Sequence, residues 1–357
     1  MKQTFVTVAL AALFFGVTAM ADIVGPLPAK APGAENDTAE VVNLGKQLYF
    51  EPRLSANGTI SCNSCHNLAA GGDDNRPVSV GVNGQLGPRS APTVFNSAFN
   101  SVQFWDGREP DLKGQASGPI TNPIEMGNQT PDDVVNRLKQ IKGDATTPGY
   151  EETFDKAYGA PNSLTFDNLT NAIAAYERTL ITPNSPFDRY ENGDQTAMGP
   201  DAVRGFQTAR AVGCFRCHTG ANFSGSDQGP GPGQYRLFPA RPDDPSSTDP
   251  ADHYIATYHL DQDLGRYGKA STDPSQKHFF RIAPLRNVAV TAPYFHNGSV
   301  QTLDEAVRVM ARVQLGKKLA PDQVSDIVAF LNALTGEFPE VVLPRLPGSP
   351  NATVIKP

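Results

Sequence analysis

The sequence predicts a mainly α-helical protein built from two related halves. Its strongest periodic segments repeat apolar residues at helical spacing, and alternating strand patterns are almost absent. A short motif with two cysteines and a histidine occurs twice, once in each half. The length of 357 residues is enough for two domains that each bury a core. With 32 Gly and 31 Pro, we expect long ordered loops between modest helices.

Residues 1–21 have the pattern of a secretory signal peptide. A short apolar run follows Lys2, and the small residues Ala19 and Ala21 predict cleavage after Ala21. The apolar run is too short to anchor the chain across about 30 Å of hydrocarbon. We therefore expect an exported protein without stable membrane insertion.

The cysteines form the most specific pattern of the chain. All 4 lie in two Cys-x-x-Cys-His motifs, which consist of Cys62, Cys65 and His66 and of Cys214, Cys217 and His218. This spacing is typical of c-type haem attachment, in which two thiols bind the porphyrin and the histidine binds the iron. Four cysteines in an exported chain would otherwise suggest two disulfides. A zinc site would need further ligands at each motif, and no other cysteine remains to supply them. The motifs predict two covalently bound haem c groups.

A short amphipathic helix is predicted before each motif, over residues 44–50 and 203–207. Two ordinary amphipathic helices would give the same pattern. Together with the motifs, however, the pair indicates a duplicated cytochrome-like domain.

Four further helices have clear patterns and end signals. Thr130 is a predicted N-cap, Thr302 and Glu305 have the spacing of a capping box, and Gly336 follows the last helix. The predicted helices cover residues 131–141, 166–180, 303–313 and 321–334.

A Pro-rich segment at residues 182–186 predicts the domain boundary. It divides the mature chain into an N-terminal domain, residues 22–183, and a C-terminal domain, residues 184–340. Residues 224–251 form a Gly/Pro/Asp-rich insertion, and residues 341–357 an extended tail. The net charge of -7 argues against nucleic acid as a partner, because binding to phosphates needs Lys and Arg, and favours a basic partner.

The chain resembles the bacterial dihaem cytochrome c peroxidases over nearly its whole mature length. The stretches that carry the resemblance lie in the family's order, at residues 61–68, 91–96, 103–108, 118–126, 285–288 and 291–298. The resemblance implies a mainly α fold of two cytochrome c-like domains, each with one covalent haem, usually in a homodimer. It also implies a periplasmic enzyme that reduces hydrogen peroxide to water with electrons from a small cytochrome c or cupredoxin.

Carried over by position, the resemblance assigns the haem ligands. His66 matches the proximal ligand of the peroxidatic haem, and His218 matches that of the electron-entry haem. Met310 matches the distal ligand of the second haem, although a methionine among apolar helical neighbours is by default a core residue. His296 matches a residue that contacts a haem propionate.

Three further residues match the family's catalytic groups. Glu125 matches the carboxylate that transfers the peroxide proton, a task that suits an acid in a haem pocket. Gln115 matches an amide that orients peroxide, and Trp105 matches the residue between the haems. Without the resemblance, Glu125 would be read as a loop or capping residue, Gln115 as merely polar, and Trp105 as packing.

The resemblance also implies a calcium ion, with two departures from the family pattern nearby. Thr291 and Pro293 match carbonyl ligands, which are suitable hard donors. Ser90 stands where the family usually has an asparagine ligand. Val82 stands where many members have a histidine that blocks the peroxidatic iron, and valine cannot bind iron.

Two other functions remain open at this level. A dihaem electron carrier would need neither Glu125 nor an open iron, and Val82 favours an open iron. A dihaem oxidase that modifies a protein side chain would carry tyrosine in place of Met310. The presence of Glu125 with Val82 favours the peroxidase over the carrier, and Met310 favours it over the protein-modifying oxidase.

Overall fold

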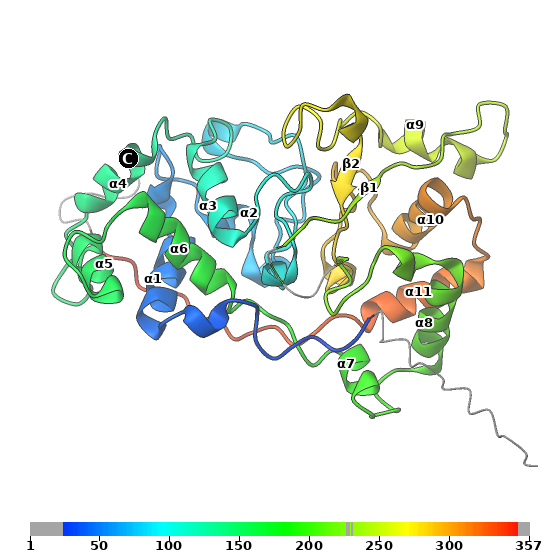
Figure 1. Ribbon diagram of the computed structural model, residues 1–357, viewed down its shortest axis with the longest axis horizontal. Helices are drawn as coiled ribbons and strands as arrows, with labels where there is room; N and C mark the ends of the chain where they lie inside the picture. The colour runs from blue at the N-terminus through cyan, green and yellow to red at the C-terminus, as the bar shows by residue number, and fades with distance from the viewer. Residues whose placement is uncertain (1–23, 226–228, 230, 349–357) are drawn as a thin grey trace, which may run out of the picture.

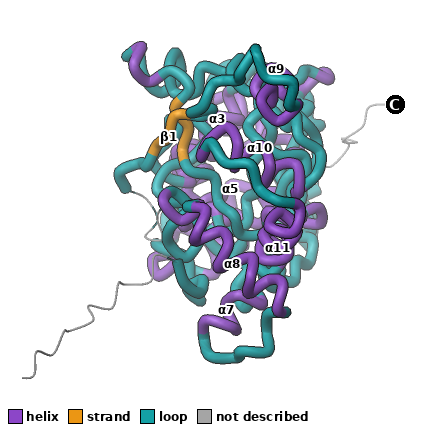
Figure 2. The backbone as a smooth tube through the Cα atoms, turned by 90° about the vertical axis from the view of Figure 1, so that its right-hand side faces the viewer, coloured by secondary structure: helices purple, strands orange, loops and turns teal. Residues whose placement is uncertain are grey.

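The computed structural model describes residues 24–225, 229 and 231–348, so the predicted signal peptide lies outside the described residues. Figure 1 shows two groups of helices, with loops and a small sheet between them. Figure 2 shows that loops make up a large share of the backbone. The predictions of a mainly helical fold and of long loops are therefore confirmed. None of the described helices has the length and hydropathy needed to cross a bilayer.

The elements alternate with loops along the described chain. The α-helices are α1 (Ala39–Tyr49), α2 (Cys62–Cys65), α3 (Leu112–Thr121), α4 (Pro131–Lys139), α5 (Tyr150–Tyr158), α6 (Phe166–Glu177), α7 (Pro186–Glu191), α8 (Pro200–Val212), α9 (Tyr254–Tyr258), α10 (Leu303–Leu315) and α11 (Pro321–Asn332). Strands β1 (Tyr235–Leu237) and β2 (Phe279–Arg281) pair antiparallel, with Arg236 opposite Phe280.

The helix before each cysteine motif crosses the last long helix of its half, with a glycine at the crossing. A Cβ atom at Gly45 on α1 would lie 1.8 Å from the carbonyl oxygen of Ala172 on α6. A Cβ atom at Gly205 on α8 would lie 1.8 Å from the carbonyl oxygen of Asp326 on α11. Only glycine permits such a close approach of two backbones. In both halves, therefore, a glycine allows two helix backbones to pack in close contact.

A polar seam joins the two halves at Thr182. Asn96 and Asn287 both adopt positive φ, at 61° and 60°. Their side-chain amides donate to the Thr182 hydroxyl oxygen at 2.8 and 2.9 Å, and all three residues are buried. Asn96 also accepts from the Thr182 backbone N–H, as Asn287 accepts from that of Gly336. Each asparagine thus holds the chain that leaves the last helix of its half.

Both ends of the described chain cross between the halves. Val24 packs in the apolar cluster of the second half. The Arg286 guanidinium donates a hydrogen bond to the carbonyl oxygen of Gly25 at 3.0 Å. The C-terminal segment returns along the first half, where Phe338 lies edge-on to Phe95 at 4.8 Å. Figure 1 shows both segments running along one edge of the molecule. The first half is thus tied to the second by more than the linker at residues 182–186.

All predicted helices are present, but the two before the cysteine motifs are longer than predicted: α1 begins five residues before residue 44, and α8 extends beyond residues 203–207 at both ends. The ends of the other four helices shift by two or three residues. The last one ends at Asn332, two residues before the predicted end, and α10 extends two residues beyond the prediction. The predicted capping box at Thr302 is wrong: no side-chain cap bond forms, and Glu305 instead accepts from the Tyr258 hydroxyl at 2.8 Å. The short helices α3, α5, α7 and α9 were not predicted.

The glycine crossing predicts a stability cost for a single methyl group. Gly205→Ala should lower the free energy of unfolding by about 1 to 3 kcal/mol, toward the upper end because backbone rather than a flexible side chain must move. Gly25→Ala is the control, because nothing lies within 4 Å of a Cβ there. Urea unfolding of the haem-loaded protein measures both. Equal stability of Gly205→Ala and the wild type would contradict the assigned packing role.

Candidate haem sites

The first cysteine motif opens onto a large cavity of about 1010 Å³ that is lined mainly by residues of the N-terminal half. Cys62, Cys65 and His66 line it together. The Nδ1 atom of His66 lies 2.9 Å from the carbonyl oxygen of Pro92, so a proton on Nδ1 leaves Nε2 free to bind iron. Burial lowers the pKa of His66, which favours the neutral imidazole that a metal needs.

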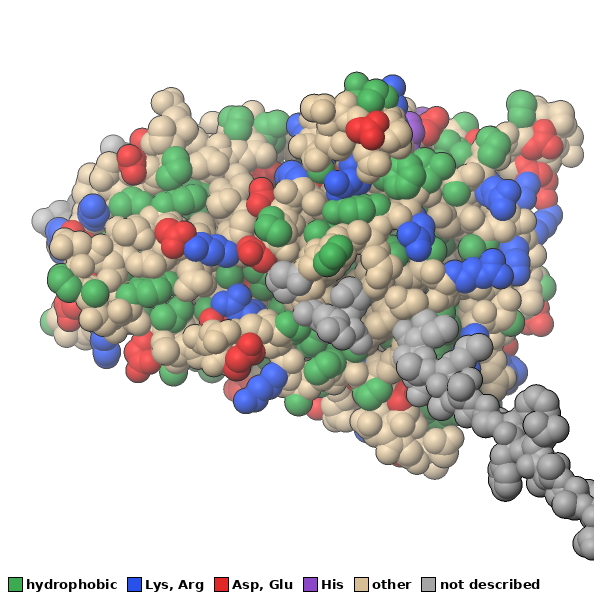
Figure 3. Space-filling model, in the orientation of Figure 1, with side chains coloured by type: hydrophobic (Ala, Val, Ile, Leu, Met, Phe, Trp, Pro, Cys, Tyr) green, Lys and Arg blue, Asp and Glu red, His purple; other side chains and the backbone are tan. Residues whose placement is uncertain are grey.

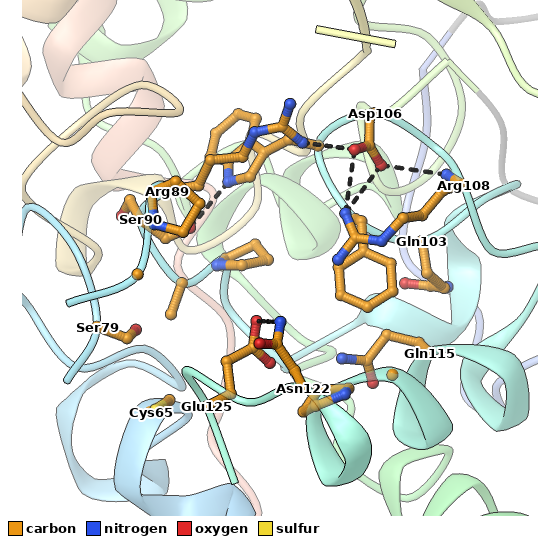
Figure 4. Close-up of a pocket in the computed structure, with 18 of the residues that line it drawn as sticks. Cys65, Ser79, Arg89, Ser90, Gln103, Asp106, Arg108, Gln115, Asn122 and Glu125 are labelled. Carbon is orange, nitrogen blue, oxygen red and sulfur yellow. Dashed lines mark hydrogen bonds and ion pairs between the residues drawn. The ribbon is translucent and has the colours of Figure 1, made fainter. Parts of the chain in front are cut away.

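Polar side chains line another part of the same cavity. Glu125 accepts a hydrogen bond from the Asn122 amide at 2.9 Å, and Gln115 lies on α3 nearby (Figure 4). Burial raises the pKa of Glu125, against the opposing charge of Arg108. The cavity therefore holds a carboxyl group whose burial favours its protonated form more than water does.

A network of ion pairs that reaches both halves lines this cavity. Arg89 binds Asp106 at 2.7 Å and Asp263, from the second half, at 2.6 Å. Arg108 also binds Asp106, at 3.0 Å, and its guanidinium lies 3.4 Å from the centre of the Phe104 ring (Figure 4). The cavity is therefore lined by residues of both halves, which the sequence did not reveal.

Val82 belongs to a segment that borders the cavity through Ser79 and Gly81, but Val82 itself does not line it. Val82 is 3% exposed and donates its backbone N–H to the Glu125 carbonyl at 2.9 Å. The Gln85 amide adds a bond to the carbonyl of Pro123 at 3.1 Å. Backbone contacts thus hold this loop against the turn that presents Glu125.

The second motif opens onto a mostly apolar cavity of about 260 Å³. Cys214, Cys217, His218 and Met310 line it. The Nδ1 atom of His218 lies 3.0 Å from the Phe223 carbonyl, and burial lowers the pKa of His218. The two histidines are thus held in the same way, each by a backbone carbonyl.

A thin wall separates the two cavities. Trp105, His296 and Arg281 line both of them. The Trp105 indole N–H donates to the Ser90 carbonyl at 2.9 Å, which fixes the ring in the wall. His296 is 2% exposed and stacks on Phe280, and burial lowers its pKa to about 4. Its Nε2 atom is buried and has no hydrogen-bond partner among the described residues.

The residues present fit two c-type haems. Each cavity brings a complete Cys-x-x-Cys-His motif together, with an imidazole whose Nδ1 lies at hydrogen-bond distance from a backbone carbonyl. The unpartnered Nε2 of His296 suits a haem propionate, since buried polar atoms normally have a partner. Met310 shares the second cavity with His218 and could bind its iron.

The three predicted calcium residues all line the second cavity. They are Ser90, Thr291 and Pro293, and Asp73, which the sequence reasoning missed, joins them there. Asp73 is 3% exposed, and burial raises its pKa to about 7. Its neighbour Asn75 donates to its carboxylate at 3.0 Å and to the Ala292 carbonyl at 3.1 Å. No motif marks Asp73, because its environment comes from residues 290–294.

The acidic stretch at residues 243–252 forms local interactions. Asp249 pairs with Lys318, Asp252 pairs with Arg312, and Asp243 accepts two backbone N–H bonds. On the face in Figure 3, acidic and basic side chains are interspersed. These pairings offset part of the negative charge that a basic partner would meet.

Fold and site together define a dihaem c-type cytochrome with a carboxyl group in one haem cavity. The model of the di-haem cytochrome c peroxidase family matches residues 39–196, and a RoxA-like, cytochrome c-like model matches residues 280–315. The cytochrome c551 peroxidase of Pseudomonas aeruginosa is 46% identical over 87% of this chain and 83% of its own length. That of Nitrosomonas europaea is 40% identical over 98% and 96%. The chain therefore belongs to the dihaem cytochrome c peroxidase family, which implies two c-type haems.

More distant relatives share the architecture. The methylamine utilization protein MauG of Methylorubrum extorquens is 35% identical over 88% of this chain and 84% of its own length. The crystal structure of a MauG-like protein associated with microbial copper homeostasis has a TM-score of 0.68 and 26% identity, and covers 87% of this chain and 94% of that one. The family thus includes proteins with names other than peroxidase.

The shared cavity of His218 and Met310 predicts a potential change. Met310→His should lower the potential of the second haem, because the thioether favours ferrous iron more than imidazole does. Met198→Leu serves as the control, because Met198 is buried but lines neither cavity. A spectroelectrochemical titration measures both variants. Unmoved potentials in Met310→His would place the ligand elsewhere.

Proposed function

We propose that this protein is a periplasmic dihaem peroxidase that reduces hydrogen peroxide to water with electrons from a small redox protein. The observation that carries the proposal is that Glu125 lines the same cavity as Cys62, Cys65 and His66. The names of the related cytochrome c551 peroxidases support the same activity.

The haem of the first cavity would supply the iron at which peroxide is bound and reduced. Glu125 accepts the proton of the bound peroxide and returns it to the departing oxygen, so that the leaving group is water. The Asn122 amide holds one oxygen of this carboxylate, which fixes its direction. Gln115 orients peroxide through its amide, and the ion pairs of Arg89 hold residues of both halves together in the cavity lining. The reaction consumes two electrons and two protons for each peroxide.

Electrons enter at the half that carries His218 and Met310, with a small cytochrome c or cupredoxin as the donor. Trp105 lines both cavities, and this supports an electron-transfer position between them. The proposal includes two cytochrome c-like domains with one haem each. The homodimer comes from the family resemblance and stays a prediction.

Calcium and export complete the proposal. Ser90 together with the carbonyls of Thr291 and Pro293 would hold one calcium ion beside the second cavity, where the Asp73 carboxylate could contribute charge. The peroxidase acts in the periplasm after signal cleavage at Ala21.

A second candidate function is the oxidation of a protein side chain, since MauG proteins are among the relatives. Met310 in the second cavity disfavours it, because tyrosine is expected there in the dihaem tryptophan-modifying enzymes. A plain electron carrier would not need the carboxyl group of Glu125.

The role of Glu125 predicts a large loss of turnover without loss of haem. Glu125→Gln should lower kcat for peroxide by about 10² to 10⁴-fold, because the amide cannot accept the proton. Glu152→Gln, on the exposed face of α5, is the matched control. Steady-state turnover with a reduced small cytochrome measures the effect, and the haem spectrum verifies loading. Unchanged kcat in Glu125→Gln would remove the carboxylate from the mechanism.

The packing of Val82 predicts activity without prior reduction. Because Val82 cannot bind iron and its loop is held by backbone bonds, the fully oxidised enzyme should have an open iron at the His66 haem. Electron paramagnetic resonance should then show a high-spin ferric signal, and peroxide should react at once. Two wholly low-spin irons without a peroxide reaction would mean that another group, such as a loop histidine or tyrosine, occupies the site.

A further inference from the structure

Glu177, the last residue of α6, is a buried acid that the proposed peroxide chemistry does not use. It is 4% exposed, and its side chain lines the same cavity as Cys62 and His66. Its Oε2 atom is buried and has no hydrogen-bond partner among the described residues. An unsatisfied buried carboxyl oxygen is costly, and the cost is far larger for the charged form.

The charges around Glu177 do not neutralise it. The adjacent cation, Arg178, forms a two-bond ion pair with Asp37, at 2.6 and 2.7 Å. The other groups that interact with Glu177 are Tyr49 on α1 and Cys62 on α2, and both are neutral in the haem-loaded protein. Tyr49 directs its hydroxyl to the His66 carbonyl, at 2.5 Å, rather than to Glu177.

Other charged and titratable residues also line the cavity. They are Arg89, Asp106, Arg108, Glu125, Asp263, Lys269, Arg281 and the histidines His66, His259 and His296. None of them contributes to the pKa of Glu177, which is set by burial and by the charge of Arg178. Burial raises that pKa to about 8, and Arg178 opposes the shift. Glu177 is therefore a carboxyl group that exchanges its proton in the neutral to mildly alkaline range, where a change in nearby charge can shift its protonation.

Reduction of the haem should make proton binding at Glu177 more favourable, and proton binding at Glu177 should make haem reduction more favourable. In a cavity of low polarity, added negative charge on the haem makes ionisation of a nearby carboxyl group more costly. Coupling between two such sites is reciprocal, so the bound proton raises the haem potential by the same free energy.

We propose that Glu177 is a redox-linked proton site of the haem attached at Cys62 and Cys65. Its carboxylate takes up one proton from solvent when the haem gains one electron, and releases that proton when the electron leaves. Charge is then conserved at the buried site in each one-electron step. The proposal needs haem attachment at this motif but not peroxidase activity.

The potential of the His66 haem as a function of pH tests this proposal. In the wild type, the potential should fall with rising pH in the neutral to alkaline range, with a slope that approaches 59 mV per pH unit, the one-electron equivalent of a tenfold change. In Glu177→Gln, the slope should vanish and the potential should stay near the wild-type acidic value, because the amide is neutral at every pH.

Glu152→Gln is the matched control, because it removes an exposed carboxyl group of α5 that does not line the cavity, and it should keep the slope. Glu177→Asp retains an acid and should keep a slope in a shifted pH range. Redox-difference infrared spectra add a direct readout. The wild type should show a protonated carboxyl band that forms on reduction and is missing in Glu177→Gln.

Three results would overturn the proposal: a flat wild-type potential, a slope that survives in Glu177→Gln, or a wild-type spectrum without a redox-linked carboxyl band. If a variant fails to load haem, the pH dependence of the potential and the infrared band of the wild type still test the proposal. Peroxide turnover is measured separately, so a failed proton site leaves the proposed peroxidase activity standing, and the reverse also holds.

Discussion

The distance between two crossing helix backbones sets the geometry of each half. Gly45 lets α1 reach the backbone of α6, and Gly205 lets α8 reach that of α11. The aromatic residues beside these crossings, Tyr176 and Phe330, then pack in clusters that also contact the first cysteine of each motif. A larger residue at either glycine would force the two backbones apart and disturb the packing around the first cysteine of the motif. The surroundings of both motifs therefore depend on a contact that involves no predicted haem ligand.

The relation between the halves depends on buried polar groups. Asn96 and Asn287 converge on the Thr182 hydroxyl, and amides in that position are specific about distance and direction. The wall between the cavities consists of residues from both halves, with Trp105 fixed by a backbone bond and His296 stacked on an aromatic ring. Electron transfer between two cofactors requires such a fixed separation. A mobile apolar interface would not supply it.

The sequence predicted the features that are local. The cysteine motifs, the capping signal at Thr130 and the amphipathic periodicity each lie within a few residues, and the structure confirms the helices and places both motifs at cavities. The resemblance to a family placed Glu125 and Gln115 in one cavity and Met310 in the other, which no local pattern could do. Asp73, Glu177 and Arg281 were missed because their burial comes from segments distant in sequence. The capping box at Thr302 failed because Tyr258, which lies far away in the sequence, competes for Glu305.

The first cavity gives three acidic side chains different environments, and the differences follow from their partners. Asp106 is held by two arginines in ion pairs. Glu125 has one amide donor and only the charge of Arg108 to oppose the rise of its pKa on burial. Glu177 has a buried oxygen without a donor, and its adjacent cation is bound to another acid, so its neutral form is favoured. Where environments separate acids in this way, roles follow from the partners rather than from the residue type. The same low-polarity space can thus contain a structural ion pair, a group that moves a substrate proton and a group whose proton follows the electron.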